Sequence, residues 1–477
     1  TYKQFTRDNG NFYIVGDKFL IQANLNSTGP FRLIVGADLG NYRHDLAMII
    51  DSEKCSVDAL KSAMLLADVD KSNADPELLK TLIQKGSLLP KEEMLEVRKK
   101  KGNLFIGIPK ETSFQERRVA LVPEAVTLLV SNGHQVLMET NAGEGSNFTD
   151  NEYSEAGAQI VYDRKSIYSC DIILKVAPPS EEEVELMIGN QTFISALQIS
   201  TQPKEILQKL TAKKITAIAW DYIQDEEGVF SIVRTMGEIA GTTSILVAGE
   251  LLSSFSQGKG LMLGGIAGVQ PAEVVVIGAG TVGEFATRAA LGLGASVKVF
   301  DNSLTRLRRL QNDLSLRVYT SIIQPKVLAK AIRRADVVIG ALRSPIGRTP
   351  CVVSEEMIQE MKSGSVLVDV SIDQGGCFET SRVTNHNDPT FIKHGVVHYC
   401  VPNIASRVSR TASFALSNTF SPMILEMGEK GGVVDLIRTH SGFRNGVYMY
   451  KGILTNEVLG KVFDLKYKDI HLLLPGM

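Results

Sequence analysis

The sequence has few of the residues from which disulfide frameworks and metal centres are built. Its five cysteines, an odd number, are widely spaced and form no C-x-x-C pair. Such a set disfavours disulfides and a zinc cluster alike, and it indicates a reducing compartment such as the cytoplasm. His394 and His398 are four residues apart, but the residues between them have strand character, and extended backbone holds such positions about 13 Å apart. We therefore expect no metal site.

Long hydrophobic runs and an excess of charge of one sign are also lacking. The 477 residues carry a formal net charge of −2, with 44% hydrophobic and 22% charged residues. This composition is that of an ordinary globular protein and offers no electrostatic basis for binding nucleic acid or an anionic membrane. No apolar run reaches the roughly 18 residues of a membrane span, and the chain begins without a signal-peptide pattern. We expect a cytoplasmic protein of two or three domains.

A glycine-rich turn is the most informative motif. The β-branched run Val274–Ile277 leads into Gly278-Ala-Gly280-Thr281-Val282-Gly283, and a second apolar run ends at Asp301, 18 residues after the last of these glycines. The first glycine permits a tight turn, the second lets the backbone approach a pyrophosphate, and the third lets helix and strand pack closely. An acid at that spacing accepts hydrogen bonds from ribose hydroxyls and repels a 2′-phosphate, so the motif predicts an NAD(H) site. The alternative is a structural glycine turn in a domain without a nucleotide.

From Leu104 onward, strand-like and helix-like patterns alternate. This alternation predicts an α/β protein with parallel, doubly wound sheets. A long helix is expected at 235–258, and a later helical segment, Ser413–Met427, contains Pro422, which predicts a kink or a break. The pattern indicates two Rossmann-like lobes with a cleft between them and the nucleotide at the switch point of the second sheet.

The N-terminal region follows a different pattern. Residues 1 to about 70 contain short segments such as Asn11–Gly16 and Phe31–Val35, which indicate a small strand-rich unit. Residues 75–100 have helical spacing and a basic end, as in a solvated helix and linker. We expect four segments: an N-terminal extension of unknown role (1–102), the first part of a substrate lobe (103–235), an NAD-binding lobe (236–404) and a C-terminal return that completes the substrate lobe (405–477).

Several motifs follow one another in a fixed order over about three quarters of the chain. They are Gly107-Ile-Pro-Lys-Glu-Thr, Glu116-Arg-Arg-Val-Ala-Leu-Val-Pro, Asn141-Ala-Gly-Glu-Gly-Ser, Leu174-Lys-Val, Glu238-Ile-Ala-Gly, Gly264-Gly-Ile-Ala-Gly, the nucleotide turn, Val368-Asp-Val-Ser-Ile-Asp-Gln-Gly-Gly-Cys-Phe-Glu and Arg410-Thr-Ala-Ser-Phe-Ala-Leu-Ser-Asn. With them the chain resembles the alanine dehydrogenase and nicotinamide-nucleotide transhydrogenase family, and the segment that begins at Asp373 is closer to alanine dehydrogenase. The resemblance implies two Rossmann-like lobes, hydride transfer across the cleft and a homo-oligomer.

The resemblance also implies catalytic roles in the cleft. Arg118 matches the arginine that holds the substrate carboxylate, which a guanidinium contacts through two parallel hydrogen bonds. The alternative for Arg118 is a surface side chain paired with Glu111 or Glu116. Asp373 matches the acid near the nicotinamide and the substrate amine, where a carboxylate balances an ammonium or iminium charge. Its alternative role is to cap a turn.

Two further residues are implied on the cofactor side. Asn403 matches the residue that touches the nicotinamide ribose or carboxamide, and its alternative is a hinge cap between the lobes. Arg306 lies five residues after Asp301 and either reaches the adenosine side or is an exposed helix arginine.

Three positions depart from the family pattern. Ala177 stands where alanine dehydrogenases carry a lysine that supplies positive charge to the substrate oxygen, and Gln198 stands where they carry a catalytic histidine. Gly237 replaces a serine. A glutamine donates a hydrogen bond to a carbonyl but exchanges no proton near neutral pH. These departures affect the half of the site that would act on the amino acid, whereas the cofactor half is expected to be intact.

Three functions agree with these observations. The first is an NAD-dependent oxidoreductase that interconverts L-alanine, or a similar amino acid, with a 2-oxo acid and ammonia, using Arg118, Gln198 and Asp373. The second is an NAD(H)-binding transhydrogenase-like subunit that passes a hydride to a second nucleotide, which needs no proton-transferring histidine. The third is a catalytically silent NAD-binding protein.

Overall fold

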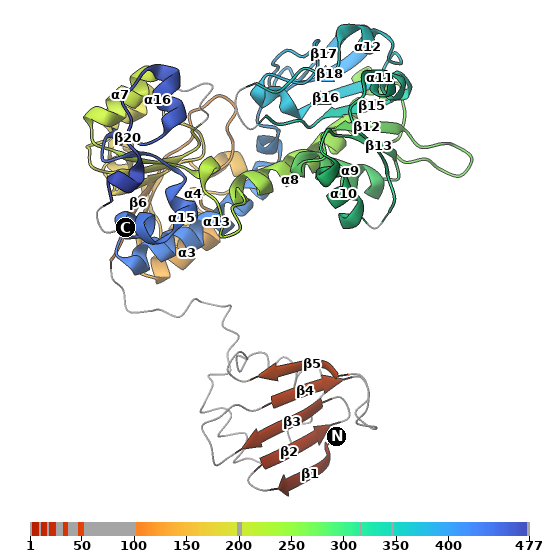
Figure 1. Ribbon diagram of the computed structural model, residues 1–477. Helices are drawn as coiled ribbons and strands as arrows, with labels where there is room; N and C mark the ends of the chain where they lie inside the picture. Colours follow the sequence, from red (N-terminus) through yellow and green to blue (C-terminus); the bar gives the residue numbers. More distant parts are fainter. Residues whose placement is uncertain are drawn as a thin grey trace. The chain divides into compact units, whose positions relative to one another are not determined.

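The computed structural model describes five strands between residues 2 and 51 by their backbone, and residues 102–197, 203–314, 316–344 and 348–474 in full (Figure 1). The chain divides into two compact units, residues 1–96 and 97–477. In the first unit, β1 (Tyr2–Asp8), β2 (Asn11–Gly16), β3 (Phe19–Asn24), β4 (Arg32–Gly36) and β5 (Leu46–Asp51) form an antiparallel sheet in chain order. The expected strand-rich unit is confirmed, whereas the expected helix at 75–100 lies outside the described residues.

The second unit contains two sheets. The eight-stranded sheet has the order β20-β19-β11-β10-β9-β6-β7-β8, and with its helices it is here called the first lobe. Its strands are β6 (Phe105–Ile108), β7 (Gln135–Glu139), β8 (Gln159–Val161), β9 (Ile172–Leu174), β10 (Thr192–Ser195), β11 (Thr216–Ala219), β19 (Val447–Tyr450) and β20 (Ile453–Leu454). The six strands from β6 to β11 are parallel, whereas β19 and β20 are antiparallel additions at one edge.

The seven-stranded sheet has the order β14-β13-β12-β15-β16-β18-β17, and with its helices it is the second lobe. Its strands are β12 (Glu273–Ile277), β13 (Ser296–Phe300), β14 (Tyr319–Ser321), β15 (Val337–Gly340), β16 (Val366–Asp369), β17 (Thr390–Lys393) and β18 (Val396–Tyr399). Apart from antiparallel β17, this is the doubly wound order 3-2-1-4-5-6, which the parallel strands of the first lobe share. The predicted fold class is confirmed.

Helices connect and cover these strands. They are α3 (Pro123–Ser131), α4 (Asp150–Glu155), α5 (Arg164–Ile167), α6 (Glu181–Leu186), α7 (Lys204–Ala212), α8 (Ser231–Leu251), α9 (Thr281–Gly292), α10 (Leu304–Asp313), α11 (Pro325–Arg334), α12 (Glu355–Gln359), α13 (Ser409–Lys430), α14 (Val433–Thr439), α15 (Ser441–Arg444) and α16 (Glu457–Phe463). Short 3₁₀ turns are η2 (Glu144–Ser146), η3 (Trp220–Tyr222), η4 (Ser254–Ser256), η5 (Val370–Gln374), η6 (Ile404–Val408) and η7 (Ile470–Leu472). Among the described helices, none has the length and apolar character needed to cross a membrane.

Two long helices differ from their expected form. Helix α8 begins at Ser231 and ends at Leu251, earlier at both ends than the expected 235–258. Helix α13 runs through Pro422 without a break. Phe420 and Ile424, on either side of this proline, are fully buried, so tertiary packing outweighs the hydrogen bond that the proline removes.

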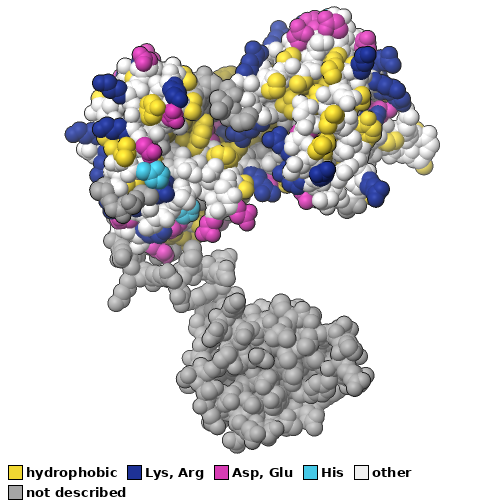
Figure 2. Space-filling view, in the orientation of Figure 1, with side chains coloured by type: hydrophobic (Ala, Val, Ile, Leu, Met, Phe, Trp, Pro, Cys, Tyr) yellow, Lys and Arg dark blue, Asp and Glu magenta, His cyan; other side chains and the backbone are white. Residues whose placement is uncertain are grey.

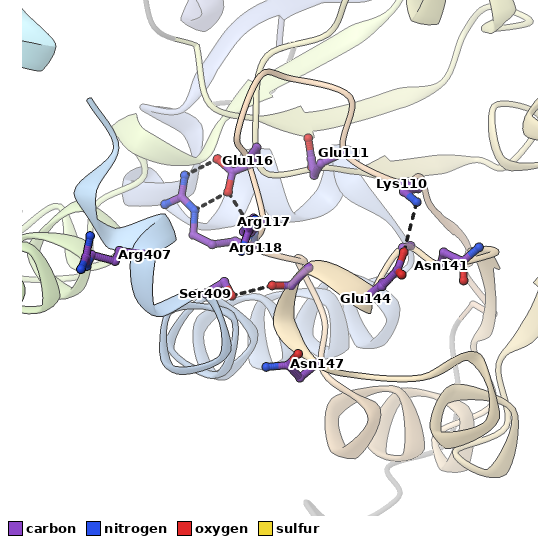
Figure 3. A pocket seen from close by; sticks show the side chains of 12 residues that line it. Lys110, Glu111, Glu116, Arg117, Arg118, Asn141, Glu144, Asn147, Arg407 and Ser409 are labelled. Carbon is purple, nitrogen blue, oxygen red and sulfur yellow. Dashed lines mark hydrogen bonds and ion pairs between the residues drawn. The ribbon is translucent and has the colours of Figure 1, made fainter. Parts of the chain in front are cut away.

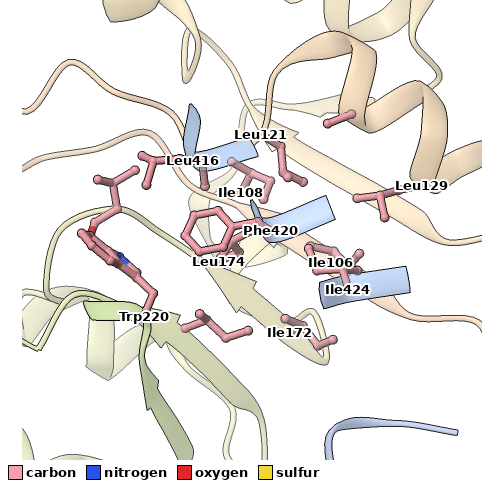
Figure 4. Packing of buried hydrophobic residues seen from close by; sticks show 14 of the residues in the cluster. Ile106, Ile108, Leu121, Leu129, Ile172, Leu174, Trp220, Leu416, Phe420 and Ile424 are labelled. Carbon is pink, nitrogen blue, oxygen red and sulfur yellow. The ribbon is translucent and has the colours of Figure 1, made fainter. Parts of the chain in front are cut away.

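The core of the first lobe joins distant parts of the chain. Figure 4 shows Phe420 of α13 packed among Ile106 and Ile108 of β6 and Leu174 of β9, all of which belong to one buried cluster. Trp220, the single tryptophan of the sequence, is buried in the same cluster and donates its indole N–H to the Val176 carbonyl over 2.9 Å. Burial of one large apolar side chain contributes about 1.5–3 kcal/mol. The C-terminal return supplies Phe420 and other members of this cluster, so it stabilises the first lobe strongly.

Candidate functional site

The glycine turn between β12 and α9 has the geometry of a phosphate-binding loop. Gly278 adopts a φ of 114°, and a Cβ there would collide with the Ala341 carbonyl, directly after the neighbouring strand β15. A Cβ on Gly283 would collide with the Gly278 carbonyl, whereas one on Gly280 would meet no atom within 4 Å. Helix α9 begins at Thr281 without a side-chain cap, which leaves the N–H groups of its first turn available to an anion.

Asp301 lies against this turn. Its side chain is buried, and its two oxygens accept the backbone N–H of Ala279 and that of Ser303, each over 2.7 Å. Arg306, which is about half exposed, lies 3.8 Å from Asp301 Oδ2. The open cradle at Gly280 and the acid at the end of β13 fit a dinucleotide with a free ribose diol.

Arg118 is buried in the first lobe, with only 6% of its surface exposed. Its Nε and Nη2 donate to the two carboxylate oxygens of Glu116 over 2.7 and 2.6 Å. The alternative that Arg118 is a surface side chain is therefore wrong, but the pairing with Glu116 that this alternative included is present. Burial opposes the ionisation of Glu116, but the adjacent guanidinium and its hydrogen bonds hold the pKa of this carboxyl below its usual value.

Asn403 joins this pair to Asp373. Its side-chain amide donates to Glu116 Oε2 over 2.8 Å, and its backbone N–H donates to Asp373 Oδ1 over 3.0 Å. Asn403 adopts a left-handed φ of 54°, which asparagine tolerates better than most residues. The Asp373 side chain keeps contact with solvent, yet desolvation by the surrounding protein raises its pKa, while the Asn403 N–H and Arg118 oppose that rise. Three predicted site residues, Arg118, Asn403 and Asp373, are thus joined in one hydrogen-bonded chain that runs through Glu116.

A second charged cluster lies at the carboxyl ends of β6 and β9, the point at which the strand order of the first lobe reverses direction. Lys175 Nζ lies 2.7 Å from Glu111 and 3.3 Å from Glu183, and its side chain has no exposed surface. Although burial lowers the pKa of Lys175, the two carboxylates hold it above its usual value. Glu111 also accepts the backbone N–H groups of Val176 and Ala177. Lys175 therefore neutralises buried acids, and the buried Ala177 adds no charge beside them.

A pocket of about 480 Å³ opens beside Arg118 and Glu116 (Figure 3). The loops that follow β6 and β7, the turn η6 and the start of α13 line it. The lining residues are Lys110, Glu111, Glu116, Arg117, Arg118, Asn141, Ala142, Glu144, Gly145, Asn147, Arg407 and Ser409. Charged and amide side chains make up most of this lining, so the pocket suits a small charged ligand better than an apolar one.

Gln198 lies outside the described residues, so its predicted role stays a prediction. The sequence offers one signal for Glu116, its place two residues before Arg118, and this signal predicts a pairing with that arginine but no bond to Asn403. Among the residues that the structure describes, no group of three His, Cys, Asp or Glu side chains is arranged to hold a metal ion.

Comparisons with known proteins cover this part of the chain. Residues 107–240 match the alanine dehydrogenase/PNT N-terminal domain, and residues 244–457 match the alanine dehydrogenase/PNT C-terminal domain. Alanine dehydrogenase 2 of Staphylococcus aureus, in strains USA300 and Mu50, is 39% identical over 367 residues, which are 77% of this chain and 98% of the relative.

Solved structures agree in fold. An L-alanine dehydrogenase structure superposes with a TM-score of 0.72 at 36% identity, over 76% of this chain and 99% of that one. A transhydrogenase from Sinorhizobium meliloti superposes with a TM-score of 0.64 at 24% identity, over 74% of this chain and 99% of that one, and it shows the fold alone. The chain belongs to the alanine dehydrogenase/PNT family of oxidoreductases.

Proposed function

We propose that this protein is an NAD-dependent dehydrogenase that oxidatively deaminates L-alanine, or a similar small amino acid, to a 2-oxo acid and ammonia. The observation that carries the proposal is the hydrogen-bonded chain that joins Arg118, through Glu116 and Asn403, to Asp373. These residues lie on elements of both lobes, and Asp301 and the glycine turn lie in the second lobe. The similarity to alanine dehydrogenases over 77% of the chain supports the choice of substrate.

The residues of the second lobe are those that NAD requires. Backbone at Gly278, Gly280 and the α9 N-terminus, from Thr281 and Val282 to Gly283, would hold the pyrophosphate. Asp301, with Arg306 beside it, would hold the adenosine ribose, and Asn403 the nicotinamide side. When bound, the cofactor supplies the acceptor for the hydride that leaves the amino-acid α-carbon.

In the substrate half of the site, charged side chains bind the two charged groups of the amino acid. The guanidinium of Arg118 binds the substrate carboxylate and orients the α-carbon, while Asp373 balances the positive charge on nitrogen. Because Lys175 is paired with two acids and Ala177 carries no charge, the usual cation at the substrate oxygen is missing. Slow turnover is therefore part of the proposal, with Gln198 as hydrogen-bond donor.

The assembly and location of the protein are also proposed. We assign 103–235 and 405–477 to the substrate lobe, 236–404 to the NAD lobe, and the protein to the cytoplasm as a homo-oligomer that binds no nucleic acid. The segment after α8 leaves large apolar side chains exposed, namely Phe255, Met262, Ile266 and Val269. Surfaces of this kind are often covered by a partner, and a second copy would cover this one. On the face shown in Figure 2, charges of both signs are spread over both lobes.

A steady-state assay tests the proposed function. NADH, ammonia and a panel of small 2-oxo acids, pyruvate first, should give oxidation of NADH at 340 nm, and L-alanine with NAD should give the reverse. Omission of ammonia is the control, because a 2-hydroxy acid dehydrogenase would still oxidise NADH without it. No turnover with any acid, although NADH binds, would contradict the proposal.

A second candidate is a transhydrogenase-like NAD(H) protein. The buried Ala177 and the fully paired Lys175 favour it, since hydride exchange between two nucleotides needs neither a cation at a carbonyl nor a proton donor. Reduction of an NADP analogue by NADH, in the presence of an NADP-binding partner subunit, would distinguish this function from a silent NAD-binding protein.

A further inference from the structure

Every acceptor position of the Glu116 carboxylate is used. Oε1 accepts Arg118 Nε and the Arg118 backbone N–H over 2.7 and 3.0 Å, and Ser406 Oγ lies 3.4 Å away. Oε2 accepts Arg118 Nη2 and Asn403 Nδ2 over 2.6 and 2.8 Å. Only 5% of the Glu116 side chain is exposed, so this carboxylate is part of the protein rather than a solvated surface charge.

These contacts fix the orientation of the guanidinium. A guanidinium offers five N–H groups in a rigid plane. Glu116 takes the Nε–Nη2 edge, whereas Nη1 contacts Met236 Sδ, a weak acceptor, over 3.4 Å. The Nη1–Nη2 edge is therefore the one directed away from Glu116, and it has the fork geometry that matches a second carboxylate.

The same carboxylate connects the two lobes. Glu116 follows β6 in the first lobe, while Asn403 follows β18 and Asp373 follows β16 in the second. The Asn403 side chain donates to Glu116 and its backbone donates to Asp373. A movement of Asn403 relative to β6 would therefore act on the same carboxylate that holds Arg118.

We infer that Glu116 is a positioning residue: it turns the Nη1–Nη2 edge of Arg118 toward the substrate carboxylate and links that arginine to Asn403. This inference rests on the proposed function for the identity of the substrate.

The test measures binding rather than turnover. Pyruvate affinity is determined by titration in the presence of NADH for the wild type and for Glu116→Gln. The variant should bind pyruvate about tenfold or more weakly, as expected when a charge-assisted contact is misaligned, while NADH alone binds within about twofold of the wild type. Glu116→Asp, which keeps the charge, should restore part of the affinity.

Gln115→Asn is the matched control. The Gln115 side chain accepts the His386 backbone N–H and donates to Asn385 Oδ1. These hydrogen bonds lie outside the Arg118–Glu116 pair, and asparagine tolerates the left-handed φ of 59° at this position. Pyruvate affinity should stay within about twofold of the wild type. An equal loss in Gln115→Asn and Glu116→Gln would overturn the inference, since it would show a general effect of the loop.

Because Glu116→Gln leaves the buried Arg118 without its charged partner, the substitution is also tested in a protein that lacks Arg118. Adding Glu116→Gln to Arg118→Leu should weaken pyruvate binding no further, if Glu116 acts through Arg118. Additive losses would overturn the inference. A wild-type protein that binds pyruvate but does not turn over would contradict the proposed function alone, whereas one that binds no 2-oxo acid would contradict both.

Discussion

The backbone N–H of Ala279 donates to Asp301 Oδ2 over 2.7 Å. This bond holds the acid at the end of β13 against the glycine turn at the end of β12. An adenosine ribose bound there meets a carboxylate that the fold has already oriented, and the neighbouring Ser303 N–H restrains the other oxygen. Discrimination between the two nicotinamide cofactors should therefore depend on Asp301.

NADH should bind at least about tenfold more tightly than NADPH, a difference of about 1.4 kcal/mol, because a 2′-phosphate beside Asp301 meets like charge and loses hydrogen bonds. Isothermal titration with both cofactors measures this difference, and Asp301→Asn should reduce it. Asp313→Asn, at an exposed position on α10, is the control and should leave it unchanged. Equal affinities in the wild type would remove the role assigned to Asp301.

Arg118→Lys should weaken 2-oxo acid binding and leave NADH affinity nearly unchanged, because the two ligands contact different lobes. Lysine cannot make the bidentate contact, and its loss costs about 1.5–3 kcal/mol. The Michaelis constants for pyruvate and NADH provide the measurement. If the constant for the acid did not change, Arg118 would serve only to neutralise Glu116.

Restoring the two family residues should raise the rate of pyruvate reduction. Ala177→Lys supplies charge to the substrate oxygen and Gln198→His supplies a proton donor, and general acid–base help is worth about 10²–10⁴-fold. The double variant should also acquire a dependence on pH near the ordinary histidine pKa of about 6.5. Single-turnover rates of both proteins between pH 5 and 9 provide the measurement.

Two results would contradict this prediction in different ways. Fast turnover by the wild type would show that the chain uses other acid–base groups. A double variant that binds NADH normally and remains inactive would favour the transhydrogenase-like or silent alternative.

Lys175→Met should destabilise the first lobe by about 3–5 kcal/mol, because the buried Glu111 would lose its cation and the buried Glu183 would keep only Arg164, at 3.4 Å. Urea unfolding followed by the fluorescence of Trp220 reports on this lobe directly, since that residue is the single tryptophan and lies in the same core. Lys209→Met on α7 removes two ion pairs with largely exposed partners and should cost no more than about 1 kcal/mol.

Asp369, at the end of β16, should make the second lobe less stable as the pH rises. Burial raises the pKa of this carboxyl to about 6, although Ser381, Cys377 and Ser371 donate hydrogen bonds that oppose the rise. The folded state therefore keeps a proton that the unfolded state loses, so stability falls between about pH 4 and pH 6, by up to about 3 kcal/mol, and then stays constant. Amide hydrogen exchange of peptides that cover β16, compared at each pH with Asp369→Asn, measures this change. The variant should lack the slope, and an equal slope in both proteins would assign it to another group.

The sequence predicted those features that local patterns encode. Gly278, Gly283 and Asp301 lie as the spacing predicts, because one strand, one turn and one helix determine their positions. The parallel sheets were predicted for a similar reason, since buried β-branched runs alternate with helical stretches over short distances along the chain.

Long-range contacts were not predictable in the same way. Asn403 and Glu116 are 287 residues apart, and their hydrogen bond depends on how η6 crosses from one lobe to the other. Burial of Lys175 depends likewise on the side chains of Glu111 and Glu183, from two other segments. The uninterrupted α13 shows a third limit, because packing of Phe420 and Ile424 overrides the local effect of Pro422.

The antiparallel pairing of β19 with β11 has a consequence for synthesis of the chain. Ala217 and Ile218 pair with Met449 and Val447, so more than 200 residues separate the two halves of this ladder. The ribosome releases all strands of the second lobe before β19 emerges, and during that interval β11 presents unpaired backbone groups at an open sheet edge. Such edges pair readily with other chains. The nascent protein therefore has one nearly complete lobe and one vulnerable lobe, and chaperone binding during translation should concentrate on the latter.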